Sequence, residues 1–220
     1  TNGNIDEKQI VETLKDKVTS IIVYQNKEYK TLYGTSKLME NMDEFTFQMS
    51  EDSFFQINTE CAIKLYKKVV EYLELDKDDN VLDLYCGTGT IGIFVSKYCN
   101  KVIGVEINES AIRNARENAK LNDIQNIEFI CKDSSKAVLT LKDKYDKIIV
   151  DPPRAGLDKN TIDFLTNSKA KRIVYVSCDP VTLARDLNLL KETYIIEEIT
   201  PVDMFPYTHH VECVVKLDLK

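Results

Sequence analysis

The chain has 220 residues, which suits one domain with a small appendage and allows a sizeable hydrophobic core. Its formal net charge of −7 argues against a free-standing nucleic-acid-binding module, which usually presents a basic face, and no apolar stretch is long enough to span a membrane. The six cysteines lie far apart without Cys-x-x-Cys spacing, so we expect mostly buried thiols and a reducing, cytoplasmic compartment.

The first 52 residues are predicted to form a small region of mixed secondary structure. The pattern predicts a helix at 5–18 and short strands at 20–24, 29–34 and 45–49. Such a piece buries little core alone. We therefore expect residues 1–52 to be part of a small α+β subdomain that packs against a larger domain, residues 53–220.

From residue 58 onward, apolar strands alternate with amphipathic helices. Strands are predicted at 80–85, 101–106, 127–131, 147–150 and 172–177, and helices at 58–75, 91–98, 109–121, 134–141, 159–167 and 180–190. Continuously apolar strands between amphipathic helices indicate a parallel sheet that is buried on both faces. The alternation then stops, so 194–200 and 212–217 should finish the sheet as an antiparallel pair. The predicted fold class is α/β.

A glycine-containing turn follows the first strand of this sheet, in the segment Tyr85-Cys86-Gly87-Thr88-Gly89. In an open parallel sheet, ligands bind beyond the C-terminal strand ends, and glycine lets the backbone approach them closely. Glu106 ends the second strand, where a carboxylate can accept both hydroxyls of a ribose. Asp133 follows the third strand, where it can reach an adenine edge. This edge is predicted to bind a nucleoside cofactor.

Two cofactor classes share such a turn, because Gly87, Gly89 and Gly92 also match the Gly-x-Gly-x-x-Gly pattern of NAD-dependent enzymes. Asp83 inside the first strand and Asp151-Pro152-Pro153 after the fourth favour S-adenosylmethionine over a dinucleotide. A glycine turn without a ligand is the third alternative. The sequence predicts a Rossmann-like, class I S-adenosylmethionine-dependent methyltransferase fold.

Cys178, at the end of the fifth strand, is a candidate nucleophile. The C5 atom of a pyrimidine is a poor nucleophile, but addition of a thiolate to C6 lets C5 attack a methyl group, after which a base removes the C5 proton. We expect the N-terminus of the helix at 180–190 to favour the thiolate. Glu212, in an apolar run, is the candidate base, and burial should raise its pKa. A structural cysteine and a solvent-facing glutamate are the alternatives.

Two other patterns narrow the chemistry. The turn Asp151-Pro152-Pro153-Arg154 ends with an arginine. Methyltransferases that act on amino groups often have a related turn, but theirs ends with an aromatic residue that stacks on a base. Direct attack by an exocyclic amine is therefore disfavoured here. His209 and His210 with Glu212 have the composition of a two-histidine-one-carboxylate metal site. Adjacent histidines in an extended chain tend to point apart, and no further ligand is evident, so we expect no metal.

Together these segments resemble the RNA 5-methyluridine (uracil-C5) methyltransferase family, whose members act on bacterial 23S rRNA or on the tRNA T-loop. The resemblance runs from about Phe45 to the C-terminus and includes the segments 53–58, 82–87, 151–154, 177–180 and 210–212. It implies methyl transfer from S-adenosylmethionine to C5 of an RNA uridine, in 23S rRNA rather than tRNA, with Cys178 as nucleophile and Glu212 as proton acceptor. It also implies these cofactor contacts: Gln56, Tyr85, Gly87, Glu106, Asp133 and Asp151, with Thr90 as a less regular member. Phe54 and Phe55 would be pocket residues or plain core.

Members of this family typically begin with a small OB-like RNA-binding barrel, and some carry cysteines for an iron–sulfur cluster; neither pattern occurs here. The chain therefore looks like a catalytic-domain fragment. We expect it to be monomeric, with RNA as its partner and no membrane association. The missing barrel would supply much of the RNA affinity. A non-catalytic S-adenosylmethionine-binding module is an alternative that the intact Cys178 and Glu212 count against. Cytosine-C5 methylation usually shows a Pro-Cys nucleophile or paired motif cysteines.

Overall fold

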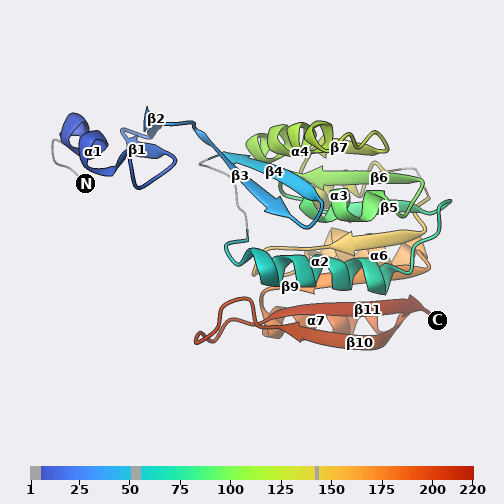
Figure 1. Cartoon of the computed structure of the whole chain (residues 1–220). Coiled ribbons are helices and arrows are strands. Elements are labelled where there is room, and N and C mark those ends of the chain that lie inside the picture. Colours follow the sequence, from blue (N-terminus) through green and yellow to red (C-terminus); the bar gives the residue numbers. More distant parts are fainter. Residues whose placement is uncertain (1–5, 51–55, 142–143) are drawn as a thin grey trace.

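The computed structural model describes residues 6–50, 56–141 and 144–220 (Figure 1). Within these ranges the main sheet has the strand order β10-β11-β9-β8-β5-β6-β7. Its parallel strands are β5 Asn80–Leu84, β6 Lys101–Glu106, β7 Ile127–Cys131, β8 Lys147–Val150 and β9 Arg172–Ser177. β11 Glu212–Leu219 runs antiparallel between β9 and β10 Tyr194–Val202. The predicted α/β fold class and the antiparallel C-terminal pair are confirmed.

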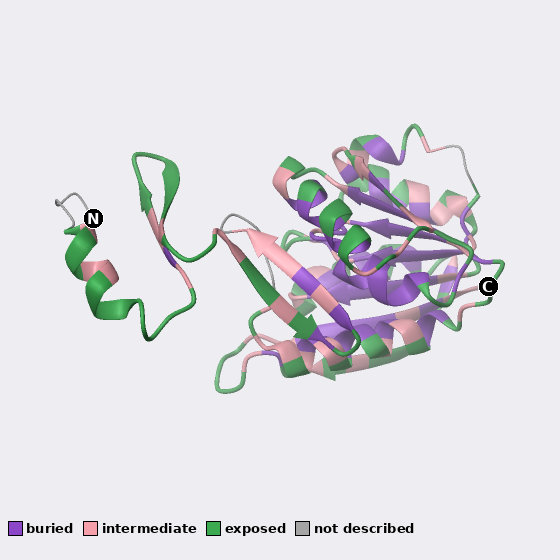
Figure 2. Cartoon of the chain, turned by 45° about the horizontal axis from the view of Figure 1, so that its top comes forward, coloured by how far each residue is buried: buried purple, intermediate pink, exposed green. Residues whose placement is uncertain are grey.

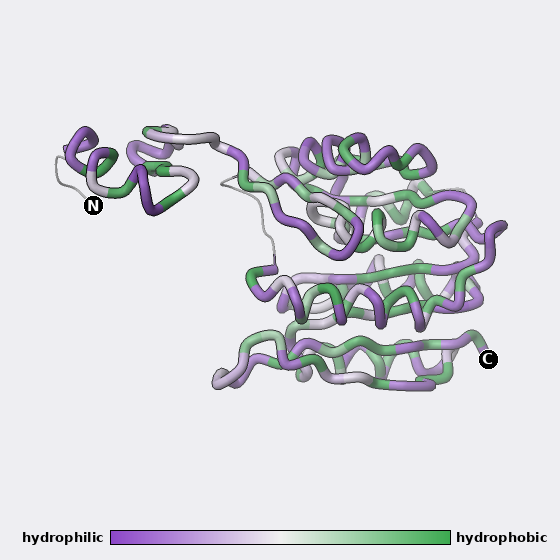
Figure 3. Tube along the Cα trace, viewed as in Figure 1, coloured by the Kyte–Doolittle hydropathy of each residue, from purple (hydrophilic) through white to green (hydrophobic). Residues whose placement is uncertain are grey.

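Helices cover both faces of the sheet, and each face has its own hydrophobic core. On one face lie α2 Thr59–Leu73, α3 Thr90–Ser96 and α4 Glu109–Leu121, and on the other α5 Ser134–Ala137, α6 Lys159–Ser168 and α7 Pro180–Leu190. Figure 3 shows hydrophobic residues along the strands and a largely hydrophilic α4. No helix in the described part of the chain is long and apolar enough to cross a membrane.

The N-terminal region divides into two parts. α1 Glu7–Leu14, β1 Ile21–Gln25 and β2 Glu28–Tyr33 contribute no residue to either core, and they lie to one side of the domain and are mostly exposed (Figure 2). β3 Lys37–Met42 and β4 Phe45–Ser50 form a hairpin whose Met42, Phe45 and Phe47 join the core beneath α2, α3 and α4. The expected packing against the larger domain is confirmed for this hairpin and wrong for α1, β1 and β2.

Apart from end shifts of one or two residues, three elements differ from the prediction. The helix predicted at 5–18 ends at Leu14 and is followed by a hydrogen-bonded turn. The helix predicted at 134–141 is only α5, which ends at Ala137. β3 was not predicted, because its two-residue turn to β4 lacks the glycine that usually marks a hairpin.

Asn118 of α4 and Asn122, which caps the C-terminus of this helix, bind the hairpin. Asn122 accepts a hydrogen bond from the Thr46 N–H at 2.9 Å and donates one to the Thr46 carbonyl at 2.7 Å. The Asn118 side-chain oxygen accepts from the Gln48 N–H at 2.7 Å, and its nitrogen donates to the Thr88 carbonyl at 3.2 Å. Asn118 is fully buried and therefore ties the β3–β4 hairpin to the glycine turn after β5.

Replacing Asn118 by alanine should lower the free energy of unfolding by about 2–4 kcal/mol, because it leaves a buried N–H and a buried carbonyl without partners. Urea denaturation followed by circular dichroism measures the loss. Asn167→Ala is the matched control, since Asn167 is exposed on α6 and bonds only within its own helix. Equal stabilities of the two variants would contradict this role of Asn118.

Candidate active site

The predicted functional residues gather at one edge of the sheet. β5, β6, β8 and β9 all end at the left-hand edge in Figure 1. The residues placed there by the strand ends are Tyr85 and Gly87 after β5, Glu106 at the end of β6, Asp151 after β8 and Cys178 after β9. Glu212 reaches the same edge because it begins the antiparallel β11.

The glycine turn and Glu106 hold each other. Gly87 and Gly89 have φ angles of +53° and +78°, which glycine adopts without strain. A Cβ on Gly89 would lie 2.7 Å from the Phe129 ring, whereas a Cβ on Gly87 would meet nothing within 4 Å. Glu106 accepts hydrogen bonds from the Gly87 N–H at 3.2 Å and the Asn108 N–H at 2.8 Å. Its carboxylate is thereby oriented beside open space at the turn.

Two of the expected cofactor contacts are engaged in local hydrogen bonds. The Tyr85 hydroxyl lies 3.2 Å from Thr161 Oγ1 and 3.4 Å from Asp158 Oδ2, and burial raises the pKa of Tyr85 to about 12. Asp133 caps α5, accepting from Ser135 Oγ at 2.5 Å and from the Lys136 N–H at 3.2 Å. The bond from Ser135 is the main reason that the pKa of Asp133 is lowered.

Three carboxyl groups, of the buried Asp83 and Glu212 and the partly buried Asp151, lie close enough to influence one another. Burial raises the pKa of Asp83 to about 7, the Gly92 N–H partly offsets this, and the Glu106 charge adds to it. The pKa of Asp151 is raised well above its usual range by burial and then by Glu212 and Asp83. Burial also raises the pKa of Glu212. The predicted rise for Glu212 is confirmed.

Side-chain oxygens of Asp83 and Gln56 have no normal hydrogen-bond partner in the described part of the chain. Neither carboxylate oxygen of the fully buried Asp83 accepts a hydrogen bond of normal geometry, although the Gly92 N–H lowers its pKa, and the side-chain oxygen of Gln56 also lacks a partner. A buried polar group without a partner costs free energy, and a buried carboxylate costs most. The arrangement therefore favours a ligand that carries positive charge and hydrogen-bond donors.

Cys178 and Glu212 come from neighbouring antiparallel strands. Ser177 at the end of β9 pairs with Cys213 of β11. Cys178 is the first residue after β9 and Glu212 is the first residue of β11, so both adjoin this last pair of the ladder. The electrostatics agree with this placement, because the pKa of Cys178 is raised by burial first and then by the charges of Glu212 and Asp151.

The expectation that a helix N-terminus favours the Cys178 thiolate is wrong. Asp179 occupies the cap of α7 and accepts hydrogen bonds from the N–H groups of Val181 and Thr182, each at 2.9 Å. These amides are therefore not directed at sulfur. Arg154 is the group that lowers the pKa of Cys178 through its charge, but burial and the carboxylates outweigh it.

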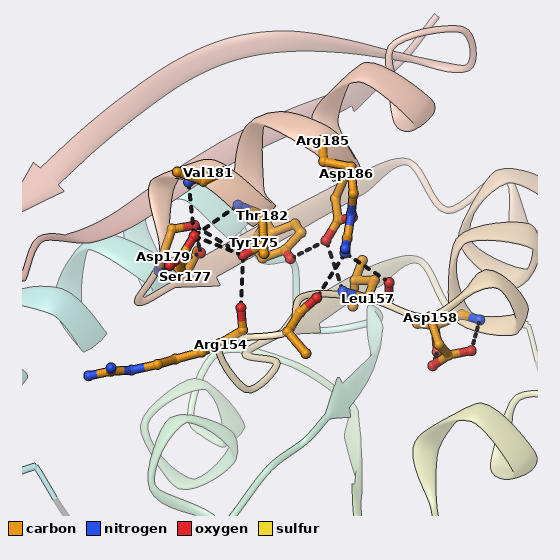
Figure 4. Close-up of polar contacts among 12 residues, drawn as sticks. Arg154, Leu157, Asp158, Tyr175, Ser177, Asp179, Val181, Thr182, Arg185 and Asp186 are labelled. Carbon is orange, nitrogen blue, oxygen red and sulfur yellow. Dashed lines mark hydrogen bonds and ion pairs between the residues drawn. The ribbon is translucent and has the colours of Figure 1, made fainter.

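The loop after β8 is held from the side by α7 and β9 (Figure 4). The fully buried Asp186 accepts hydrogen bonds from the Leu157 N–H and the Tyr175 hydroxyl, each at 2.8 Å. Arg185 donates to the carbonyls of Ala155 at 2.9 Å and Leu157 at 3.2 Å.

The turn of this loop is closely fitted to α7. A Cβ on Gly156 would lie 2.5 Å from both Arg185 and Asp186. Thr182 Oγ1 donates to the Arg154 carbonyl at 3.1 Å, while the Arg154 side chain extends away from this network in Figure 4. The backbone of the Asp-Pro-Pro-Arg segment is therefore fixed, and its guanidinium is free to face the edge of the sheet.

Sequence reasoning missed Asp186, Arg185 and Tyr175. The available signal was the charged Asp186 on the apolar face of α7, whose buried residues are Leu183, Asp186, Leu187 and Leu190. A carboxylate at helical spacing among leucines must be paired or strongly perturbed. Tyr66 of α2 was also missed; its hydroxyl bonds to the side chain of Thr90, and burial raises its pKa.

The two histidines behave differently from expectation. The ring centroids of His209 and His210 lie 4.2 Å apart, so the expectation that these side chains point apart is wrong. In the described ranges, no group of three or more histidine, cysteine or acidic side chains could hold a metal ion. The predicted pocket residues Phe54 and Phe55 lie outside the described residues.

Asp83→Asn should change how stability depends on pH. In the folded, ligand-free protein Asp83 has a raised pKa, so its contribution to stability is full below pH about 4 and is lost as pH rises through 7. Asparagine does not titrate, so the variant does not lose this stability as pH rises. Its free energy of unfolding relative to wild type should therefore increase by about 1–3 kcal/mol between pH 5 and pH 8, as measured by urea denaturation. Asp163→Asn, an exposed site on α6, is the control. Parallel pH profiles for wild type and Asp83→Asn would show that this carboxyl is not perturbed.

Comparison with known proteins agrees with this geometry. A protein of Staphylococcus aureus (strain MSSA476) named as an uncharacterized RNA methyltransferase is 42% identical over 214 residues, covering 96% of this chain and 47% of the relative. A protein of Clostridium acetobutylicum with the same description is 44% identical over 212 residues, covering 94% and 46%. The chain thus spans about half the length of the curated relatives it matches.

A solved structure and a family model point in the same direction. The Pyrococcus abyssi tRNA (uracil-54, C5)-methyltransferase, solved in complex with S-adenosyl-L-homocysteine, superposes with a TM-score of 0.82 at 35% identity, over 99% of this chain and 54% of that one. The sequence model of the tRNA (uracil-5-)-methyltransferase family matches residues 6–220. The resemblance seen in the sequence is confirmed, and the chain belongs to the tRNA (uracil-5-)-methyltransferase family.

Proposed function

We propose that this chain carries the catalytic machinery of an RNA (uracil-5-)-methyltransferase, which transfers a methyl group from S-adenosylmethionine to C5 of a uridine. The observation that carries the proposal is the pairing of Ser177 with Cys213, which brings a thiol at Cys178 and a buried carboxyl at Glu212 to the same end of the β9–β11 ladder, close enough for the Glu212 charge to raise the pKa of Cys178. Family membership and the 35% identical uracil-54 methyltransferase support the same reaction.

The residues at the edge fit S-adenosylmethionine. The unpartnered side-chain oxygen of Gln56 suits a ligand with donor groups, the enclosed Asp83 carboxyl favours a positive charge nearby through its own charge, and the carboxylate of Glu106 lies beside the open space at Gly87. The proposed holding residues are Gln56, Tyr85, Gly87, Glu106, Asp133 and Asp151. When bound, the cofactor supplies a methyl group on a positively charged sulfur. The similar Pyrococcus protein was solved with S-adenosyl-L-homocysteine.

The proposed reaction has three covalent steps: addition of sulfur to C6, methylation of C5 and elimination of sulfur. Cys178 loses its proton to solvent, and the thiolate adds to uracil C6 with the electron pair moving toward C5 and O4. C5 would then take the methyl group, whose bonding electron pair would stay on the sulfur of the cofactor. The carboxylate of Glu212 removes the C5 proton, the C5–C6 double bond forms again, and the Cys178–C6 bond breaks to release the sulfur. The raised pKa of Glu212 suits a group that must accept this proton.

The target RNA is a finer part of the proposal. The sequence favours 23S rRNA, whereas the Pyrococcus relative is named for uridine 54 of tRNA. Mass mapping of methylated uridines in both RNAs, from cells with and without the full-length gene, decides between them. A missing methyl group in 23S rRNA supports the first, and one in tRNA supports the second.

Cys178→Ala and Glu212→Gln should separate the two catalytic roles. Cys178→Ala should abolish methyl transfer and form no adduct with RNA that contains 5-fluorouridine, because fluorine cannot leave as a proton and traps only a protein that has added to C6. Glu212→Gln should still add and methylate, but should lower turnover by about 10²- to 10⁴-fold and accumulate a methylated RNA–protein adduct. Denaturing gels and mass spectrometry detect both adducts.

Cys131→Ala is the matched control, because Cys131 is an exposed thiol that ends β7 at the same edge of the sheet. It should form the adduct at the wild-type rate. An adduct in Cys178→Ala would place the nucleophile at another cysteine. Normal turnover by Glu212→Gln, without accumulated adduct, would place the base elsewhere.

A further inference from the structure

The connection between β10 and β11 ends in a turn that exposes an aromatic ring. The Thr208 N–H bonds to the Phe205 carbonyl at 3.1 Å, Pro206 is second in the turn, and Tyr207 is third with a φ of +67°. This is the pattern of a type II turn, whose third position is normally glycine. Tyr207 has a relative exposure of 108%, so the turn holds its whole side chain in solvent.

A tyrosine in this position is unusual on two grounds. Bulky residues seldom adopt positive φ, and such strained positions occur most often at functional sites. Glycine or asparagine would form the same turn without strain. In the described part of the chain, the other aromatic residue with positive φ is Tyr85, in the glycine turn of the candidate active site.

The two ends of the loop that carries this turn are anchored near Cys178 and Glu212, the proposed catalytic pair. Met204 is buried, and its carbonyl accepts a hydrogen bond from the Asn58 side chain at 3.1 Å. At the other end of the loop, β11 begins at Glu212, next to the Cys213–Ser177 pair that precedes Cys178. In Figure 1 the loop extends past the edge at which the parallel strands end. The loop that carries Tyr207 is therefore anchored at both ends, at the edge of the sheet that bears the proposed site.

Further rings and a cation accompany Tyr207. The rings of His209 and His210 are 4.2 Å apart, and the Phe205 ring meets His210 edge-on at 6.3 Å. The pKa of His210 is lowered by partial burial and then by the charges of His209 and Arg154, which places the Arg154 guanidinium on this side of the loop. Planar rings with a neighbouring guanidinium are the groups that bind single-stranded RNA, by stacking on bases and by contact with phosphate.

We propose that Tyr207 stacks on a nucleotide next to the target uridine, in single-stranded or opened RNA, and so positions the substrate over Cys178 and Glu212. The inference rests on the proposed function. A uridine that leaves its stack to reach Cys178 exposes the face of its neighbour, and an aromatic ring can replace the lost stacking partner. Tyr207 is a positioning residue in this account, since it does not touch the reacting atoms.

The test compares Tyr207→Ala, Tyr207→Phe and Tyr207→Gly in the full-length protein. Binding of a short fluorescein-labelled single-stranded RNA with one central uridine is measured by anisotropy in the presence of S-adenosylhomocysteine, and methyl transfer to the same RNA gives KM and kcat. Alanine and glycine should weaken RNA binding and raise KM about 5- to 100-fold, as for loss of one stacked base, while phenylalanine stays near wild type. Affinity for S-adenosylhomocysteine should not change.

Two controls separate stacking from structure. Tyr207→Gly relieves the positive φ, so its unfolding temperature should be no lower than that of wild type even though RNA binding is weakened. Tyr98→Ala removes an exposed tyrosine after α3, at the opposite edge of the sheet, and should leave RNA binding unchanged.

Wild-type RNA affinity in Tyr207→Ala or Tyr207→Gly would overturn the stacking role and leave the proposed function standing, provided that wild type methylates the RNA. If wild type transfers no methyl group to any uridine-containing RNA, the proposed function fails and this inference fails with it.

Discussion

The buried carboxyl groups at the C-terminal edge of the sheet are the constraint on which the site depends. Asp83 lies inside a strand that is covered by helices on both sides, so its carboxylate cannot reach bulk water. Burial raises its pKa to about 7, and the pKa values of Asp151 and Glu212 are raised in the same way. Holding such groups together costs stability unless they are protonated or meet a positive charge. A cationic ligand with hydrogen-bond donors supplies the positive charge that these carboxyl groups lack.

The same electrostatic field acts on the proposed nucleophile, Cys178. Burial and the charges of Glu212 and Asp151 keep Cys178 protonated at neutral pH, and Arg154 opposes them only in part. A positive charge bound among the carboxylates attracts the Cys178 thiolate and therefore lowers the pKa of Cys178. The chemistry of the thiol is thereby coupled to the occupancy of the neighbouring site. Asp186 supports the loop that follows the Asp-Pro-Pro-Arg segment through its hydrogen bond with Leu157. Asn118 supports the glycine turn through its hydrogen bond with Thr88. These supports keep the charged groups of the two loops at fixed separations.

The sequence predicted the sheet well because its signals are local and repeated. Continuous apolar strands, amphipathic helices and a glycine turn each reflect one element, and residues at the ends of parallel strands must meet at one edge. Cys178 and Glu212 could be named from their motifs, and the register then showed why the two segments belong together. The resemblance to a family added the roles, which no periodicity could provide.

What the sequence did not reveal depends on tertiary contacts. Asp179 captures the amides that were expected to favour the Cys178 thiolate, a choice of hydrogen-bond partner that no local pattern records. The β3–β4 turn lacks glycine, so the hairpin was missed until its pairing was seen. The strain at Tyr207 is invisible in the sequence, because Pro-Tyr fits many turns and only the backbone angle distinguishes this one.

Calorimetric titration with S-adenosylmethionine at pH 7, in buffers with different ionisation enthalpies, tests the central claim most directly. A cation that binds among carboxyl groups with raised pKa values displaces their protons, so the observed heat should vary with the buffer and affinity should rise from pH 6 to pH 8. Asp83→Asn should reduce the proton release, and S-adenosylhomocysteine, which lacks the sulfonium charge, should release fewer protons. Identical heats in all buffers, with an affinity independent of pH, would contradict the claim that these buried carboxyl groups are held for a cationic cofactor.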